Sequence, residues 1–218
     1  MSIASVITQL KGELPSTVKL VAVSKFKPVE DILEAYAAGQ RAFGENRPQE
    51  LAAKARVLPD DIEWHFIGHL QTNKLKQVIP YAALIESVDS EHLLAEVDKA
   101  ARAFGRTVDI LLEIHIAAEM TKQGFSPDEA LALARRIDDF PGVHLRGVMG
   151  MATFTDDMEE VRREFRTLKG VSEQLQAIRP GCDAVSMGMS DDWPIAVEEG
   201  TTIVRIGSAI FGKRDYTK

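Results

Sequence analysis

The chain carries Ser186-Met-Gly-Met-Ser190-Asp-Asp192 and, shortly after it, Val204-Arg-Ile-Gly-Ser208-Ala-Ile-Phe-Gly212. In each segment an apolar strand end runs into glycine and hydroxyl residues at a possible helix start. Backbone N–H groups cluster at such places, and a phosphate can bind there. The last two strand-to-helix loops of a (β/α)8 barrel are a recurrent phosphate site of this kind. The two segments therefore predict a TIM-type barrel with a phosphorylated ligand.

The rest of the chain repeats a short apolar strand followed by an amphipathic helix. We expect strands at residues 19–23, 41–44, 64–67, 83–88, 108–116, 144–149, 184–186 and 202–205. The pattern predicts one α/β domain over residues 1–218, with a single (β/α)8 barrel at 19–216 and an extra N-terminal helix within 1–18. An open, doubly wound sheet is the alternative, because the strands at 41–44 and 184–186 are too short to identify alone.

Composition narrows the possible partners. The 218 residues include 26 Lys and Arg against 33 Asp and Glu, a formal charge of -7, so the average field repels nucleic acid. The single cysteine, Cys182, excludes an intramolecular disulfide and fits a reducing compartment. No apolar stretch reaches membrane-spanning length, and the first ten residues lack a signal-peptide pattern. We expect a cytoplasmic monomer that binds neither nucleic acid nor membrane.

Lys25 is the candidate reactive group. It follows the first expected strand, so its amine lies at the barrel mouth and faces the same cavity as Arg205. Partial burial and a second cation both favour the neutral amine, which can form a Schiff base with an aldehyde. A surface lysine at a strand end is the alternative. A ligand with both an aldehyde and a phosphate would use the lysine and the phosphate loops together. Pyridoxal 5'-phosphate (PLP) is such a ligand, and a phosphosugar bound as in a lysine-dependent aldolase is the competing choice.

Several motifs occur in one order along the chain. They are Ala22-Val-Ser-Lys25-Phe-Lys-Pro28, Phe43-Gly-Glu-Asn46, Trp64-His-Phe-Ile-Gly68, Ser186-Met-Gly-Met-Ser190-Asp191 and Val204-Arg-Ile-Gly207 with Ile210-Phe-Gly212. Together they resemble the pyridoxal phosphate homeostasis protein family, the YggS or PROSC type, over residues 19–216. The resemblance implies a single barrel like the N-terminal domain of alanine racemase, with PLP held as a Schiff base on Lys25.

The resemblance also implies roles for other positions. The phosphate would be held by the serine motif and the last strand end, which here means Ser190, Gly207 and Ser208, and Ser186 is a further expected cofactor-binding position. Arg205 matches the arginine that faces the pyridine nitrogen, and Asn46, His65 and Met149 match pocket-lining positions. The chain departs from the family pattern at Arg47, Pro48, His115 and Trp193-Pro194, where we expect altered rim contacts rather than lost cofactor binding.

An arginine against the pyridine nitrogen makes the ring a poor electron sink, whereas catalytic PLP enzymes usually place an acid there. Alanine racemase shares that arginine, but racemisation needs a second base, which in the racemases is a tyrosine from an additional domain. Tyr36, Tyr81 and Tyr216 are not expected at the mouth. We therefore predict a non-catalytic protein that buffers PLP or delivers it to PLP-dependent apoenzymes. A low-activity amino-acid racemase or related Schiff-base enzyme is the alternative, and an interaction protein with a vestigial pocket is a third possibility.

No metal site is expected, because His65 and His69 do not share a helical face.

Overall fold

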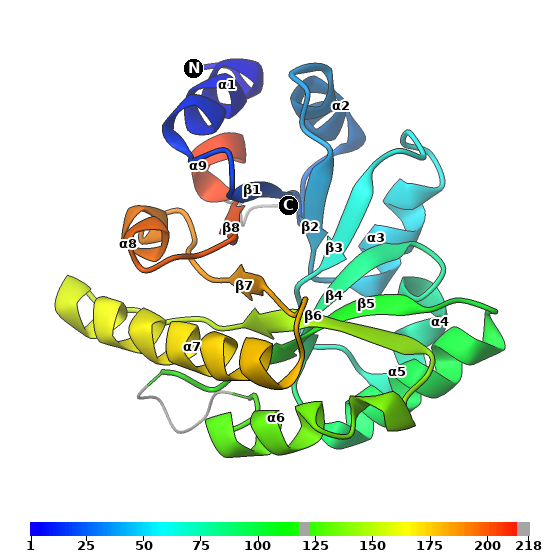
Figure 1. Cartoon of the computed structure of the whole chain (residues 1–218). Helices are drawn as coiled ribbons and strands as arrows, with labels where there is room; N and C mark the ends of the chain where they lie inside the picture. Colours follow the sequence, from blue (N-terminus) through cyan, green and yellow to red (C-terminus); the bar gives the residue numbers. More distant parts are fainter. Residues whose placement is uncertain (118–122, 213–218) are drawn as a thin grey trace.

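Residues 1–117 and 123–212, which the computed structural model describes, contain eight parallel strands that close into a barrel (Figure 1). Each strand pairs with the next one along the chain, and β8 pairs with β1. The strands are β1 (Lys19–Val23), β2 (Ala42–Glu45), β3 (Glu63–Phe66), β4 (Ala82–Val88), β5 (Val108–Glu113), β6 (Val143–Met149), β7 (Ala184–Ser186) and β8 (Ile203–Ile206). The predicted (β/α)8 barrel is confirmed, and the open sheet is wrong.

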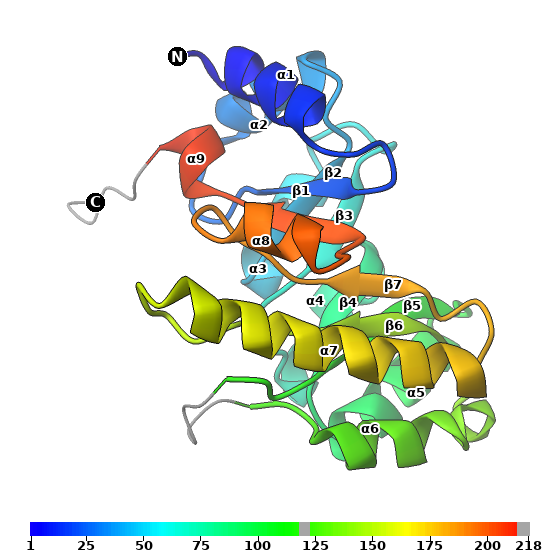
Figure 2. The same cartoon turned by 60° about the vertical axis from the view of Figure 1, so that its left-hand side comes forward.

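The helices lie around the outside of this barrel. They are α1 (Ile3–Glu13), α2 (Val29–Ala37), α3 (Pro48–Ala55), α4 (Leu75–Val78), α5 (Glu91–Ala103), α6 (Pro127–Ala134), α7 (Met158–Ile178), α8 (Trp193–Glu198) and α9 (Ser208–Phe211), with 3-10 turns η1 (Thr72–Lys74) and η2 (Ile137–Asp139). The N-terminal helix α1 contacts α2 and α9, as both views show (Figure 2). In the described part of the chain, none of the helices has the length and apolar character needed to cross a membrane.

Local signals set several helix boundaries. Ser126 and Glu129 form a capping box at the start of α6, with Pro127 at the first helical position. Ser90 caps α5 by accepting a hydrogen bond from the N–H of Leu93. Because these contacts join residues three apart in sequence, the sequence predicts them without knowledge of the barrel.

The strand at the fifth position is shorter than predicted. It ends at Glu113 rather than at residue 116. Beyond that point the N–H of Ile114 donates to the carbonyl oxygen of Met149, while His115 donates to Phe125. Phe125 in turn donates to Glu113. The chain leaves the barrel because Phe125 takes the place of a strand partner, and this contact lies beyond any local sequence signal.

Inward-facing side chains alternate with outward-facing ones along each strand. Val21, Ala42, Leu84, Leu111, Met149 and Ile203 form a small apolar cluster apart from the main core. Glu86 follows Leu84 by two residues on β4, and Arg205 follows Ile203 by two residues on β8. Both charged side chains are buried. The barrel therefore carries a charged layer next to an apolar one, and the charged layer lies nearer the carboxyl ends of the strands.

Candidate functional site

The two C-terminal segments meet where β7 and β8 end. The N–H of Arg205 donates to the carbonyl oxygen of Gly188 at 2.9 Å, and the N–H of Gly207 donates to the hydroxyl of Ser190 at 3.4 Å. Gly188 has a φ of 95°, and a Cβ there would lie 2.6 Å from the Cβ of Ala196, so the loop requires glycine. Ser190, Gly207 and the exposed Ser208 are thus brought together at the barrel mouth.

Lys25 lies beside these loops. It follows β1, which pairs with β8 through Ala22 and Ile206, and its side chain is half-buried. Gly207 lies against Val23, since a Cβ on this glycine would approach the Val23 Cβ to 3.2 Å. Barrel closure therefore places a lysine from the start of the fold next to the hydroxyl and glycine loops from its end.

A buried ion pair supports the turn that carries Lys25. The Nζ of Lys54 donates to Glu45 Oε1 at 2.8 Å and to the carbonyl oxygen of Ser24 at 2.9 Å, and the Ser24 hydroxyl donates to the same Glu45 oxygen at 2.6 Å. Burial raises the pKa of Glu45 above its ordinary value, although Lys54 opposes this. Phe26 has a φ of 63°, and its N–H donates to Glu50 at 2.8 Å. Sequence reasoning placed Glu45 in the Phe43-Gly-Glu-Asn46 motif without giving it a role, and it missed Lys54. The one available signal was a carboxylate within an apolar strand.

Arg205 is held inside the barrel by a second buried network. Its Nη1 donates to the Ser186 hydroxyl at 2.5 Å, which donates to Glu86 Oε2 at 2.5 Å. The other carboxylate oxygen of Glu86 lies 2.5 Å from His65 Nδ1. Burial acts to raise the pKa of Glu86, but the hydrogen bond and charge of His65, with Arg205 and Ser186, keep it below its ordinary value. His65 and Ser186, both expected among the cofactor-binding residues, are buried members of this network.

Asn46 and Met149 occupy two further strand ends. Asn46 follows β2, and its Oδ1 is buried with no hydrogen-bond partner in the described residues. The backbone of Asn46 lies close to Gly68: a Cβ added to Gly68 would be 2.3 Å from the carbonyl oxygen of Asn46. Met149 ends β6 and is 1% exposed, directly before Gly150, whose carbonyl oxygen accepts from Arg205 Nη2 at 3.0 Å. Asn46 thus offers an unused acceptor, and Met149 an apolar contact near Arg205.

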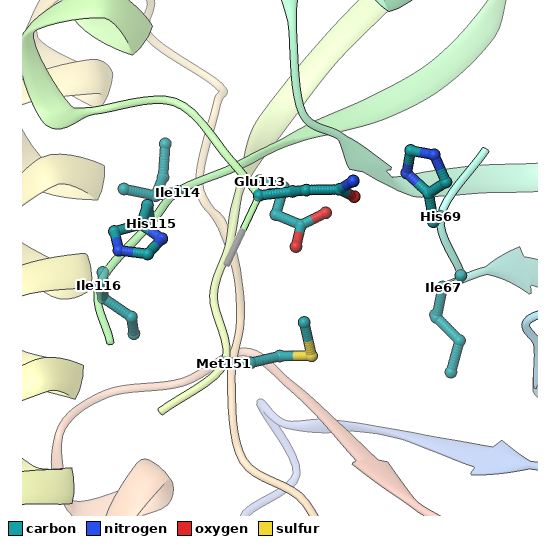
Figure 3. A pocket seen from close by; sticks show the side chains of 9 residues that line it. Ile67, His69, Glu113, Ile114, His115, Ile116 and Met151 are labelled. Carbon is teal, nitrogen blue, oxygen red and sulfur yellow. The ribbon is translucent and has the colours of Figure 1, made fainter. Parts of the chain in front are cut away.

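Sequence reasoning also missed Glu113, which ends β5 at a cavity of about 250 Å³ (Figure 3). The walls include Ile67, His69, His115, Ile116 and Met151. Glu113 is 8% exposed, and burial together with the negative charge of Asp89 raises its pKa to about 7, although Arg205 opposes this. A carboxyl group that titrates near neutral pH therefore faces this cavity.

This raised pKa predicts a pH-dependent cost to stability. Glu113 ionises near pH 4.5 in the unfolded chain and near pH 7 in the folded one, so its ionisation opposes folding. The cost begins above pH 4.5 and is complete above pH 7, where linkage limits it to about 3 kcal/mol. We expect Glu113→Gln to gain stability over the parent at pH 8 and not at pH 4.5, measured by urea unfolding.

The control for that measurement is Glu63→Gln. Its hydrogen bond with Lys19 lowers the pKa of Glu63, so this carboxylate stabilises the fold above its unfolded pKa and loses that effect as the pH falls. The two variants should therefore shift in opposite directions between pH 4.5 and pH 8. An equal effect of Glu113→Gln at both pH values would show that its carboxyl has an ordinary pKa.

A closed barrel with a lysine after β1, a buried arginine on β8 and hydroxyl and glycine loops after β7 and β8 defines the class of alanine racemase N-terminal-domain barrels. The profile described as "Alanine racemase, N-terminal domain" matches residues 2–215. Within that class the chain belongs to the pyridoxal phosphate homeostasis protein family. The protein of that name from Pasteurella multocida (strain Pm70) is 42% identical, over 93% of this chain and 89% of its own length.

Solved structures agree with this assignment. PipY of Synechococcus elongatus PCC7942 without PLP has a TM-score of 0.91 at 38% identity, covering 97% of this chain and 100% of that one. The PLP-bound structure of PipY has a TM-score of 0.87 at 37% identity over the same shares. An alanine racemase from Clostridium difficile 630 has a TM-score of 0.82 at 15% identity, and the match covers 99% of this chain and 58% of that enzyme. This last likeness shows the fold alone.

Proposed function

We propose that this chain binds PLP at the barrel mouth as a Schiff base on Lys25, and that it buffers or delivers the cofactor without turning over a substrate. The observation that carries the proposal is the placement of Lys25 next to the loops of Ser190 and Gly207 on paired strands. The names of the relatives and the PLP-bound structure of PipY support it.

The residues of the mouth fit the chemistry of PLP. Ser190, Gly207 and Ser208 offer hydroxyl and backbone N–H groups for the phosphate. Arg205 would face the pyridine nitrogen. The buried Oδ1 of Asn46, which has no hydrogen-bond partner within residues 1–117 and 123–212, is an acceptor that a bound ligand can use. Ser186 holds Arg205 in place directly, by accepting a hydrogen bond from its Nη1, and His65 does so through Glu86. When bound, PLP supplies the aldehyde that the amine of Lys25 engages.

Two observations bear on whether the protein is a carrier or an enzyme, and they point in opposite directions. Tyr36 is hydrogen-bonded to Asp61 and Tyr81 to Arg56, both on the outer layer, while Tyr216 lies outside the described residues. Neither described tyrosine is placed as the second base of a racemase. Glu113 favours the alternative, a weak racemase or related Schiff-base enzyme, because a carboxyl with a pKa near 7 can exchange protons at neutral pH.

The proposal also covers the domain organisation, the protein partners and the cellular compartment. We take residues 1–218 as one cofactor-binding domain in which residues 1–18 are an N-terminal extension. The acceptors of the cofactor would be PLP-dependent apoenzymes. The protein would be a monomer in the cytoplasm. The single buried thiol of Cys182 fits the reducing environment of that compartment.

Replacement of Lys25 tests the proposal. We expect Lys25→Ala to bind PLP about tenfold more weakly or worse in equilibrium dialysis, because the phosphate and ring contacts stay but the covalent bond is lost. The control is Lys99→Ala, which removes an amine from the exposed face of α5. Unchanged binding in Lys25→Ala would contradict the Schiff base. Steady conversion of an amino acid by the parent protein, lost in Lys25→Ala, would favour the enzyme instead.

A further inference from the structure

We propose that the cavity beside Glu113 is a subsite for a primary alkylammonium group that has no neighbouring carboxylate. A lysine side chain on a protein and a small free amine share this chemistry. The inference rests on the proposed function, because such an amine would there stand in the same barrel mouth as the aldehyde of PLP.

The first argument is that two polar groups on the cavity wall have no partner among the described residues. The carboxyl group of Glu113 points into the cavity (Figure 3), and its side chain makes no hydrogen bond or ion pair with the described residues. On the neighbouring wall, His115 Nδ1 is buried and has no hydrogen-bond partner within residues 1–117 and 123–212. An ammonium group brings three donors and no acceptor, so it can donate to the Glu113 carboxylate, and also to His115 Nδ1 in the tautomer whose proton is on the other ring nitrogen.

The second argument is the apolar remainder of the wall. Ile67, Ile116 and Met151 line the same cavity. An alkyl stem can lie along such side chains while its charged head reaches a polar group. A cavity of about 250 Å³ holds several times the volume of one water molecule, about 30 Å³, and so has room for a short alkyl chain.

The third argument is that the charges on this wall disfavour amino acids. Asp89 acts on Glu113 as a like charge, and it is itself paired with His69 Nδ1 at 3.3 Å. The α-carboxylate of an amino acid would add another negative charge beside these two, whereas an alkylammonium adds none. Electrostatic repulsion of the wrong ligand is an ordinary source of specificity.

The cavity is joined to the proposed cofactor site through β6. Glu113 pairs with Met149 across the sheet, and Arg205 Nη2 donates to the carbonyl oxygen of Gly150. Met151, the next residue, lines the cavity. The cavity wall and the contact that holds Arg205 are therefore made by adjacent residues, Met151 and Gly150.

The test is a pair of ligands that differ only in the carboxylate, n-pentylamine and norleucine. Binding to the protein without PLP is followed by NMR of 13C-labelled methionine methyl groups, with Met151 as the reporter. We expect saturable shifts at Met151 with n-pentylamine and at least about tenfold weaker binding of norleucine. We also expect Glu113→Gln to weaken n-pentylamine binding about tenfold, because a hydrogen bond to a charged group is lost.

Matched controls separate charge from folding. Glu63→Gln removes a carboxylate from the start of β3 and should leave n-pentylamine binding unchanged. A circular dichroism melt confirms that Glu113→Gln is folded. Equal binding of the two ligands, or equal binding by the parent and Glu113→Gln, would overturn the inference.

Two further measurements complete the test. One identifies the source of the amine, and the other distinguishes failure of this inference from failure of the proposed function. A peptide with one internal lysine should bind the subsite if the source is a protein side chain, and n-pentylamine alone should bind if it is a small amine. PLP binding by the parent protein is measured in parallel. Absence of PLP binding would contradict the proposed function, whereas PLP binding without amine binding would overturn only this inference.

Discussion

Replacing Glu86 by leucine is expected to lower the free energy of unfolding by about 3–5 kcal/mol, because it leaves a buried charge without its partner. Glu86 is 0% exposed and Arg205 is 4% exposed, with 3.7 Å between Arg205 Nη1 and Glu86 Oε2. The same carboxylate accepts hydrogen bonds from Ser186 and lies against His65, so its loss also removes two hydrogen bonds. Urea unfolding of the parent and the variant measures the effect.

The double variant Glu86→Leu with Arg205→Leu is the control for this result. It removes both charges of the pair, so its cost should be smaller than the sum of the two single costs. A loss below about 1 kcal/mol in Glu86→Leu would mean that Arg205 is solvated in the native state and not held by this network. The position proposed for Arg205 at the pyridine nitrogen would then lose its structural support.

Replacing Lys54 by methionine is expected to cost about 3 kcal/mol at pH 8, since it leaves the buried carboxylate of Glu45 without its cation. The Lys54 side chain is 9% exposed and that of Glu45 is 0% exposed. Burial already raises the pKa of Glu45, and removal of the cation raises it further, so the carboxyl takes up a proton as the pH falls. The cost in urea unfolding should therefore be smaller at pH 5 than at pH 8.

The same variant should also weaken PLP binding, because Lys54 holds the carbonyl oxygen of Ser24 directly before Lys25. Lys99→Met, on the exposed face of α5, should change neither stability nor PLP binding measurably. A cost of Lys54→Met, relative to the parent, that is the same at pH 8 and at pH 5 would contradict the buried ion pair as the support of this turn.

The parts of the fold that were predictable depend on local signals. β1 and β7 fall at the predicted residues, 19–23 and 184–186. The meeting of Lys25 and Gly207 was predictable in outline, since a closed parallel barrel gathers all its strand ends at one mouth.

The contacts that hold the site were not predictable in this way. Ser186 and Glu86 are 100 residues apart in sequence, and only barrel closure makes them neighbours. Glu45 and Lys54 are nine residues apart, in a strand and in the helix behind it, and their pairing depends on how α3 packs. Glu113 reaches its cavity because β5 ends where Phe125 takes over its backbone hydrogen bonds. Long-range packing, not residue type, decides each of these roles.

The most direct test of the Schiff base on Lys25 is borohydride reduction of the PLP-loaded protein, followed by peptide mapping. Reduction converts a Schiff base into a stable secondary amine, so the account predicts a pyridoxyl group on the peptide that contains Lys25 and loss of the yellow colour. The Lys25→Ala protein, treated in parallel, should carry no label at this peptide. A label that lies on another lysine, or a loaded protein that reduction does not label at all, would contradict the account.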